Sequence, residues 1–468
     1  MKRKNILILT LSVSAACWMP LSLTAQNKVN DSTTPLHALQ PEYKYGYGIP
    51  SADSVKATID RVANYLEAVT PARLTDKATG RAVTNYAKID ANTRIEQGDF
   101  RLTSYEWGVT YAAMLTAYKV TGDRRYLDYT VSRLRFLADV YPHFRKLKQQ
   151  GKSIDPLMEK VVAPAALDDA GAVCVSMIKA MKTDPSLPLD PLIENYMDYI
   201  LHHQYRLADG TLARTRPQLN TLWLDDMFMG IPPIAWYATY KTERSSELMN
   251  EAVGQVKKFA GRMWVDDKHL FRHGWVEAMN PHPSFFWGRA NGWALLTLCE
   301  VLDALPSDHA ARPMVMRLFQ QHLQGLLAYQ SGDGFWHQLL DRPDSYEETS
   351  ATAIYVYCMA HAINQGWIDA KAFGPSALLG WHAVASQVTQ GGQVAGVCVG
   401  TGMAFDPAFY YYRPVNVYAA HGYGPAILAG AEVIQLLNSH TIRMNDSAVH
   451  FYRNPPKSTE PIFYVDEE

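Results

Sequence analysis

The sequence predicts an all-α protein, an (α/α)6 barrel of six helical hairpins, and three observations lead to this fold class. Some stretches, such as 126–141, carry their apolar side chains on one stripe, which is typical of a half-exposed helix. Others, such as 104–121 and 349–365, are apolar nearly all round, which is typical of a helix buried on every side. The two kinds alternate along the chain, and this alternation predicts an outer ring of helices around an inner ring.

Each of six half-exposed stretches is followed by a buried one. The half-exposed stretches lie near 52–68, 124–141, 190–205, 244–263, 311–329 and 371–387, and the buried ones begin near 104, 168, 225, 291, 349 and 422. Six pairs that close on themselves form one domain, so we expect a single barrel over 51–440. A length of 468 residues would otherwise suggest about three domains of about 150 residues each. An open solenoid is the alternative, and it predicts more uniform repeats and polar end caps.

Composition excludes several classes of protein. The 44 Lys and Arg residues balance 46 Asp and Glu residues, so a nucleic-acid binder with a strongly basic surface is excluded. A chain that is 48% apolar and 19% charged is too apolar to be disordered. No glycine-rich phosphate loop precedes a helix, so we expect no nucleotide cofactor. The 11 Trp and 27 Tyr residues fit either a large helical core or a sugar-binding cleft.

The N-terminus predicts a secretory signal in residues 1–25. Three basic residues at 2–4 precede an apolar run over 6–19 and the small residue Ala25. That run is shorter than the roughly 20 residues that a membrane span needs. We therefore expect an exported protein, periplasmic or extracellular and without a membrane-inserted segment after signal removal. Lipidation at Cys17 is the weaker alternative.

Flanking segments and oligomeric state complete this organisation. Residues 26–50 are polar and rich in turn-forming residues, which predicts a leader before the barrel, and we expect residues 441–468 to form a tail that packs on it. The sequence gives no signal for an oligomeric state.

Four cysteines follow the signal, and their spacing indicates neither a disulfide framework nor a metal site. Cys174, Cys299, Cys358 and Cys398 form no CxxC pair and have no histidines at the spacing of zinc sites. The first three lie in apolar helical stretches, where a cysteine behaves as a small hydrophobic residue. We therefore expect no metal and no cofactor.

The starts of the buried helices carry polar and aromatic residues that a core helix does not need. These strings are 106–108 (EWG), 167–171 (LDDAG), 223–229 (WLDDMFM), 287–293 (WGRANGW), 348–351 (ETSA) and 421–424 (HGYG). Acids at a helix N-terminus also have a structural explanation, because the helix dipole and capping favour them by about 0.3–1 kcal/mol each. Six such starts meeting at one end of a barrel, rimmed by Trp and Tyr, predict a functional site.

The strings at 222–229 (LWLDDMFM), 287–293 and 348–351, with the stretch 400–424 around Asp406, resemble the unsaturated rhamnogalacturonyl hydrolases, glycoside hydrolase family 105. The related unsaturated glucuronyl hydrolases match these strings less closely. The resemblance runs over most of residues 100–436. It implies an (α/α)6 barrel that removes a 4,5-unsaturated uronic acid from the non-reducing end of lyase-cut pectic oligosaccharides. It also implies hydration of the enol ether without a metal.

The resemblance also suggests roles for acids and a histidine. Asp225 matches the residue that transfers protons, and Asp226 is a less favoured substitute for it, with helix capping as its structural alternative. Asp169 matches a second aspartate that holds sugar hydroxyls or the water, with Asp168 as its nearest rival. His273 matches a histidine near the sugar ring.

Chemistry suggests further substrate contacts. Arg289 is the natural partner of the uronate carboxylate, since a guanidinium binds a carboxylate through two hydrogen bonds, and a salt bridge to an inner-helix acid is its alternative. Trp223 and Trp287 could stack on a sugar, whereas Trp293 fits the barrel core better. Trp336 is expected to line the cleft.

Two further features keep alternatives open. Tyr410, Tyr411 and Tyr412 either rim the site or form a packing strand, and Glu348 either caps its helix or touches the substrate. Two rival functions also remain. One is a conventional glycosidase, which needs two carboxylates about 5–5.5 Å or more apart, or a polysaccharide lyase on the same barrel. The other is an exported carbohydrate-binding protein without catalytic activity.

Overall fold

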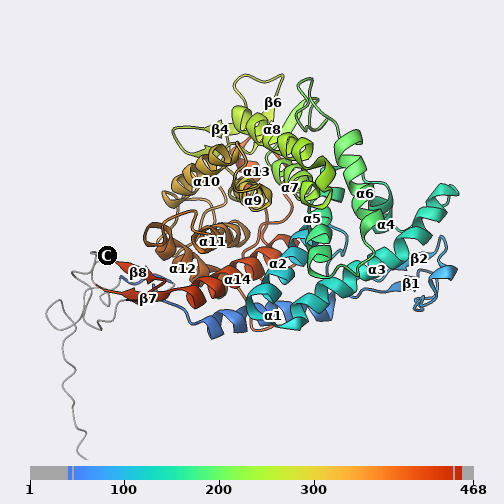
Figure 1. Cartoon of the computed structure of the whole chain (residues 1–468), viewed down its shortest axis with the longest axis horizontal. Helices are drawn as coiled ribbons and strands as arrows, with labels where there is room; N and C mark the ends of the chain where they lie inside the picture. Colours follow the sequence, from blue (N-terminus) through green and yellow to red (C-terminus); the bar gives the residue numbers. More distant parts are fainter. Residues whose placement is uncertain (1–40, 45–46, 446–447, 456–468) are drawn as a thin grey trace, which may run out of the picture.

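Six inner helices form a closed ring in the computed structural model, which describes residues 41–44, 47–445 and 448–455. They are α2 (Tyr105–Thr121), α5 (Leu167–Thr183), α7 (Asp225–Tyr240), α9 (Gly288–Ala304), α11 (Thr349–Asn364) and α14 (Tyr423–Ser439). Each inner helix contacts the next, and α14 contacts α2 (Figure 1). The predicted (α/α)6 barrel is confirmed.

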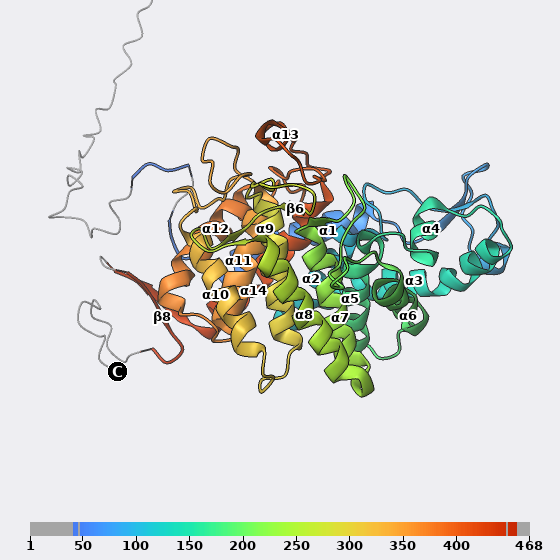
Figure 2. The same ribbon diagram turned by 90° about the horizontal axis from the view of Figure 1, so that it is seen from above.

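Six outer helices surround this ring. They are α1 (Ala52–Val69), α3 (Arg124–Gln149), α6 (Asp190–Asp198), α8 (Ser245–Met263), α10 (Arg312–Leu327) and α12 (Ala370–Ser386). Each of the last five packs on the inner helix that precedes it in the chain, and α1 packs on α14. The first helix of the barrel therefore covers the last, which brings the two ends of the ring together (Figures 1 and 2).

Small residues let the inner helices approach closely near their starts. A Cβ atom at Gly171 of α5 would lie 1.8 Å from the carbonyl oxygen of Met229 on α7, and one at Gly108 of α2 would lie 2.4 Å from the backbone of Ala172. Contacts at these distances leave no room for a side chain, so glycine is required at both positions. These residues all lie in the first two turns of their helices, so α2, α5 and α7 run side by side in the same direction.

Short strands and helices connect the barrel helices, and a last pair of strands follows α14. They are α4 (Pro156–Val162), α13 (Pro407–Tyr411), β1 (Leu74–Asp76), β2 (Thr93–Ile95), β3 (Thr221–Trp223), β4 (Trp264–Val265), β5 (Leu270–Phe271), β6 (Gly274–Val276), β7 (Thr441–Met444) and β8 (Val449–Tyr452). The strands pair antiparallel as β1 with β2, β3 with β6, β4 with β5 and β7 with β8. Strand β8 contacts α12, so the part of the predicted tail that is described lies against the barrel. Figure 2 shows β6 and α13 toward the same end of the barrel.

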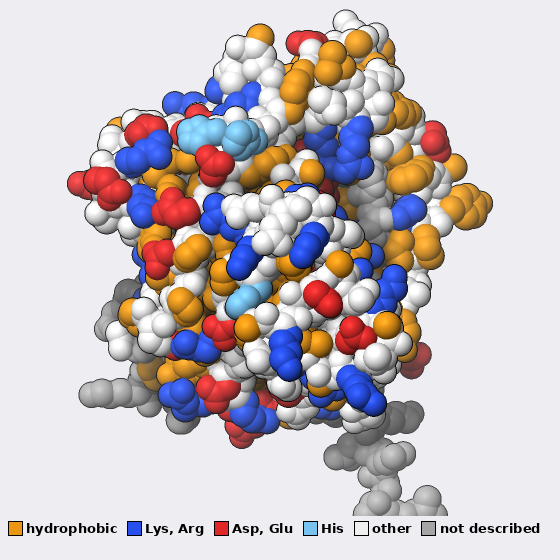
Figure 3. All heavy atoms as spheres, turned by 90° about the vertical axis from the view of Figure 1, so that its right-hand side faces the viewer, with side chains coloured by type: hydrophobic (Ala, Val, Ile, Leu, Met, Phe, Trp, Pro, Cys, Tyr) orange, Lys and Arg blue, Asp and Glu red, His pale blue; other side chains and the backbone are white. Residues whose placement is uncertain are grey.

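The predicted signal at 1–25, with Cys17, lies outside the described residues, as do most of the leader at 26–50 and the end of the tail. Export stays a prediction. Among the described residues no single helix has the length and apolar composition of a membrane span. Helices α4 and α5, which are bent relative to each other, meet both criteria only as a pair. On the face shown in Figure 3, basic and acidic side chains are interspersed, as the near-balanced composition suggests.

Candidate functional site

The pairing of β3 with β6 brings Asp225 and His273 together at the start of α7. Trp223 pairs with Gly274 in the strand register, and the Leu224 N–H donates to the His273 carbonyl at 2.9 Å. Asp225 is the first residue of α7, and its Oδ2 lies 2.9 Å from His273 Nε2. Two residues that are 48 positions apart in sequence therefore meet because one two-stranded sheet joins the loops before α7 and α9.

Tyr410 of α13 fixes the other side of the His273 ring. The Tyr410 hydroxyl lies 2.7 Å from His273 Nδ1 and accepts a hydrogen bond from the Ala404 N–H at 3.1 Å. Since the Tyr410 oxygen accepts from Ala404, its own proton is free to donate to Nδ1, and this leaves Nε2 as the donor to Asp225. Burial raises the pKa of Tyr410, which keeps this proton in place.

Asp225 is held as a carboxylate. Burial acts to raise its pKa, but the hydrogen bond from His273 and the positive charge of Arg214 outweigh burial, and the pKa of Asp225 lies below its usual value. The position at the start of α7 acts in the same direction, because a helix N-terminus stabilises negative charge. A buried carboxylate that keeps its charge is suited to accept a proton.

Arg214 joins two further acids beside this group. Its Nε and Nη2 donate to the two oxygens of Asp226 at 2.7 and 2.6 Å, and Nη2 also donates to the two oxygens of Asp168 at 3.2 and 3.1 Å. The guanidinium lies over the Trp223 ring at 4.1 Å, so the ring packs against Arg214 on that face. Both oxygens of Asp226 accept from Arg214 and its side chain is 1% exposed, whereas the Asp168 side chain is 27% exposed, so Asp168 is the more accessible of the two acids. The sequence gives no signal for Arg214, because it lies in an irregular loop without a repeated spacing.

The pKa of Asp168 is raised, whereas that of Asp225 is lowered. Burial raises the pKa of Asp168 to about 6, and the neighbouring charges of Asp226 and Asp225 add to this effect while Arg214 opposes it. Two carboxyl groups at one site with pKa values pushed apart can act as an acid and a base.

Asp169 is bound to other groups than Arg214, and its role toward the sugar or the water stays a prediction. Its Oδ1 binds Lys160 Nζ at 2.9 Å, and its Oδ2 accepts from the Ala165 N–H at 3.2 Å. Successive residues of an α-helix point about 100° apart, so only one of two adjacent aspartates can face Arg214. That residue is Asp168, which the sequence ranks second.

Arg289 is buried and largely committed to backbone oxygens. It is 1% exposed, and its Nη1 and Nη2 each donate at 2.7 Å, to the carbonyls of Cys398 and Val399. Its Nη1 also lies 3.7 Å from Glu348 Oε1, which is the salt bridge with an inner-helix acid that the sequence leaves as an alternative. Glu348 caps α11 by accepting from the Ala351 N–H at 2.6 Å. Arg289 thus holds the loop around 398–399, and its role toward a uronate stays a prediction.

The tryptophans predicted to contact sugar are less accessible than expected. Trp287 is 1% exposed and lies between the His273 ring, at 4.6 Å, and the Arg289 guanidinium, at 4.5 Å. Trp336 is 0% exposed, with its indole N–H donating to the Leu326 carbonyl at 2.7 Å, so it is a core residue and does not line a cleft. Neither ring has a free face, since packing covers both of them. Trp223 keeps partial exposure.

Other aromatic residues near the site agree with the sequence-based expectations only in part. Trp293 is 1% exposed and stacks on Phe228 at 5.0 Å, which fits the core position considered for it. The sequence does not single out Tyr105, yet its hydroxyl lies 2.6 Å from His421 Nε2. The strand considered for 410–412 is wrong, since Tyr410 belongs to helix α13.

A group of side chains whose atoms could hold a metal ion is also present in the part of the chain that the structure describes, but away from Asp225. Cys299, Asp303 and His361 form it, near the ends of α9 and α11.

Comparison with protein families identifies the chain. Residues 74–437 match the family model described as Glycosyl Hydrolase Family 88. The chain belongs to this family. The resemblance to unsaturated uronyl hydrolases that the motifs indicate is thereby confirmed.

Individual relatives agree with this family. An unsaturated 3S-rhamnoglycuronyl hydrolase of Formosa agariphila is 28% identical over 254 residues, which are 52% of this chain and 66% of the relative. An unsaturated rhamnogalacturonyl hydrolase of Bacillus subtilis (strain 168) is 26% identical over 242 residues, which are 51% of this chain and 68% of the relative. The matched segments therefore span about two thirds of these curated relatives.

A solved structure supports the fold of this family 88 chain. A protein from Salmonella enterica serovar Paratyphi A, described as a possible member of family GH105, superposes with a TM-score of 0.63 at 21% identity. The superposition covers 84% of this chain and 96% of that chain. At this identity the likeness concerns the barrel alone.

Proposed function

We propose that this protein is a glycoside hydrolase that removes a 4,5-unsaturated uronic acid from the non-reducing end of lyase-generated, rhamnogalacturonan-type oligosaccharides. The observation that carries the proposal is the pair Asp225 and Asp168. Asp225 is a carboxylate fixed by His273, and burial raises the pKa of Asp168 to about 6. Family membership and the names of the two curated relatives support the same reaction class.

The reaction is hydration of an enol ether that is conjugated with a carboxylate. A proton adds to C4 of the unsaturated sugar, and the oxygen of a water molecule adds to C5 while the water loses a proton. The product is a hemiketal, which opens to a keto sugar and releases the remaining oligosaccharide. The protein therefore needs one group that gives a proton and one group that takes a proton.

The two aspartates divide these roles in the proposed mechanism. Asp168 gives its proton to C4, because its raised pKa leaves a fraction of it protonated near neutral pH. Asp225 takes the proton from water, since His273 holds it as a carboxylate. A single aspartate could also serve both steps, first as the acid and then as the base. Because the pKa of Asp225 is lowered, this group is deprotonated near neutral pH and rarely carries a proton to give, which favours the division.

Positive groups at this end of the ring suit an anionic substrate. The charge of Arg214 lowers the pKa of Asp225, and the charge of Asp225 raises the pKa of Arg289. The Nη1 atom of Arg214 is buried without a hydrogen-bond partner among the described residues. The inner helices also direct their N-termini to this end, where backbone N–H groups favour anions. We propose that the uronate carboxylate binds beside these arginines, with Trp223 as the aromatic residue nearest to the sugar.

Loss of ultraviolet absorbance tests the function directly. The purified chain is incubated with a panel of lyase-generated unsaturated disaccharides that differ in the sugar next to the uronate. Consumption of the double bond of a uronyl-rhamnose member, with release of rhamnose, is the expected result. Activity on a saturated glycoside, or a gain of absorbance on an intact polysaccharide, would instead support the glycosidase or lyase alternatives. Binding without any product would support a carbohydrate-binding protein.

A further inference from the structure

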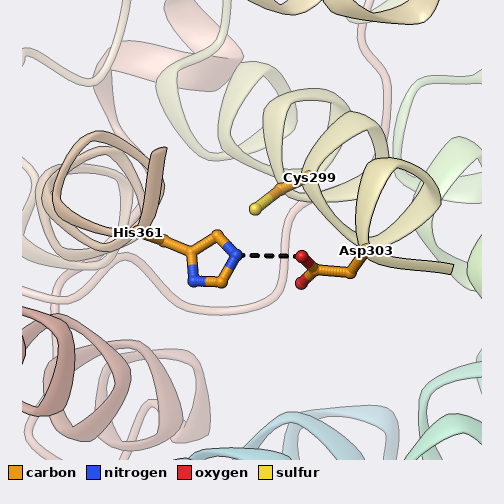
Figure 4. A group of neighbouring side chains, drawn as sticks. All are labelled: Cys299, Asp303 and His361. Carbon is orange, nitrogen blue, oxygen red and sulfur yellow. Dashed lines mark hydrogen bonds and ion pairs between the residues drawn. The ribbon is translucent and has the colours of Figure 1, made fainter. Parts of the chain in front are cut away.

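Three side chains with metal-ligating atoms meet at the end of the ring opposite to Asp225. Cys299 and Asp303 lie one turn apart on α9, and His361 lies on α11 (Figure 4). One ligand atom from each residue lies within 4.8 Å of the other two. We propose that this cluster binds one Zn²⁺ ion, through Cys299 Sγ, a carboxylate oxygen of Asp303 and His361 Nε2.

The ligand types favour zinc over calcium and magnesium. A thiolate, an imidazole and a carboxylate are the three ligand types of protein zinc sites, with bonds of about 2.0–2.3 Å. Calcium and magnesium prefer oxygen ligands and do not use a thiolate. His361 Nε2 already lies 3.0 Å from Asp303 Oδ1. In a tetrahedral site the ligand atoms are about 3.5 Å apart. Displacements of about 1 Å in the ligand atoms therefore suffice to close the cluster around an ion.

The surroundings of His361 provide a second, independent observation. Its Nδ1 lies 2.9 Å from Glu432 Oε1 on α14, and Glu432 Oε2 in turn accepts from Asn364 Nδ2 at 2.7 Å. A histidine that ligates a metal commonly donates its other ring N–H to a carboxylate, which fixes the ring and its tautomer. Here that carboxylate directs Nε2 toward Asp303 and Cys299.

The cluster is also accessible from solvent. A cavity of about 670 Å³ borders Asp303, His361 and Glu432, while Cys299 lies buried behind them. Three protein ligands leave the fourth tetrahedral position open, and water or a small anion can reach it through this cavity. Lys179 on the cavity wall forms an ion pair with Glu300 at 2.7 Å, and so it does not compete with the metal for the Asp303 carboxylate.

Zinc binding would join α9 to α11 at this end of the ring. Cys299 binds as a thiolate and His361 binds through Nε2, which now carries a proton bonded to Asp303, so both protons leave to solvent as the Zn–S and Zn–N bonds form. The ion then replaces the contact between Asp303 and His361 by two metal bonds. A ligand that binds only the folded chain raises the free energy of unfolding, so zinc should stabilise the barrel. This inference is independent of the proposed function.

Metal titration of the full chain tests the site. After treatment with a chelator and dialysis, the protein is titrated with Zn²⁺ and measured by native mass spectrometry and thermal unfolding. We expect one ion per chain and a higher unfolding temperature. Titration with Co²⁺ should produce the near-ultraviolet absorption of a cobalt–thiolate bond. C299S should abolish that absorption and weaken zinc binding by at least 100-fold, and E432Q should weaken it by about 10–100-fold.

A matched control and two negative outcomes make the test decisive. C174S removes another buried thiol, on α5, and should bind zinc as the unchanged chain does. Absence of stoichiometric zinc, or cobalt binding without thiolate absorption, would overturn the proposal. Equal zinc affinity in C299S would do the same, and D303N replaces C299S if the latter does not fold. Those outcomes would leave Asp303, His361 and Glu432 as a partly exposed ion-pair triad.

Discussion

The two ends of the inner ring use similar side chains in different ways. At the N-terminal end, Asp225 binds His273 through one oxygen, and Asp168 keeps a raised pKa of about 6. At the C-terminal end, His361 is bonded on both ring nitrogens, to Asp303 at 3.0 Å and to Glu432 at 2.9 Å. A carboxylate with a free oxygen can react, whereas a histidine held on both sides is fixed in place.

Helix polarity accounts for part of this difference. The inner helices present N–H groups at one end and carbonyl groups at the other, which favour anions and cations respectively. An anionic sugar therefore suits the end where Asp225 lies, and a cation suits the end where Cys299 and His361 lie. The comparison predicts that changes at the first end alter catalysis, and that changes at the second alter stability.

The largest effect is expected for D225N. Asparagine keeps the size of the side chain but cannot accept a proton from water, so kcat should fall by about 10³-fold. Loss of substrate absorbance measures the rate, and calorimetry should still detect substrate binding. D190N is the matched control, since Asp190 is the first residue of an outer helix, α6, and its change should leave the rate intact. An unchanged rate in D225N would remove Asp225 from the mechanism.

D168N should cost about 10²-fold in rate and should change the pH profile. In the unchanged enzyme the rate should fall above about pH 6, because Asp168 loses the proton that it must donate. D168N should lack this fall. D169N is the neighbouring control and should lose much less activity, because Asp169 binds Lys160. A larger loss in D169N than in D168N would restore the sequence-based assignment.

Asp168 also predicts a stability effect of defined sign. Its folded pKa of about 6 lies above the ordinary value of 3.8, so the folded state binds more protons between these values. The free energy of unfolding should therefore fall as pH rises through this window. D168N removes that fall, and so its stability relative to the unchanged chain should increase from about pH 4 to pH 7. Urea unfolding at several pH values measures the free energy of unfolding of both chains. A difference between them that does not change with pH would contradict the raised pKa of Asp168.

A smaller catalytic effect is expected for Y410F. Phenylalanine removes the hydroxyl that binds His273 Nδ1, which costs about 1 kcal/mol of positioning, or about fivefold in kcat. Y411F is the control, because Tyr411 binds Asp344 at the surface and does not contact His273. Equal rates in both variants would show that Tyr410 does not orient the histidine.

The smallest effect on rate is expected for E300Q, at the opposite end. Glu300 accepts from Lys179 at 2.7 Å and from the Trp236 indole at 2.6 Å, and it is nearly buried. Its loss should lower the free energy of unfolding by about 1–3 kcal/mol, while kcat/KM at 25 °C stays the same. A marked loss of activity in this variant would break the separation between the two ends.

Much of the fold was predictable because it depends on periodicity. The inner helices are apolar all round and the outer ones on one face, and both patterns follow from how much of each helix is buried. The starts of α2, α5 and α7 fall within one residue of the predicted positions near 104, 168 and 225. The motif strings also indicated which end of the ring carries the candidate site.

Side-chain partners were less predictable, since they depend on helix rotation and on loops. The rotation of α5 decides that Asp168 faces Arg214 while Asp169 binds Lys160. Packing decides that Trp336 is a core residue, because its indole N–H finds a carbonyl inside the barrel.

The sequence by itself determined the ring of helical hairpins, the family and the end at which Asp225 lies, because these follow from local spacing and from contiguous motifs. Only the tertiary structure decided which groups share a hydrogen bond or a charge. Asp225 meets His273 through a strand pair, and Cys299 meets His361 across two helices. Contacts between distant segments depend on how the helices of the closed ring pack against one another. Residue spacing along the chain does not predict that packing.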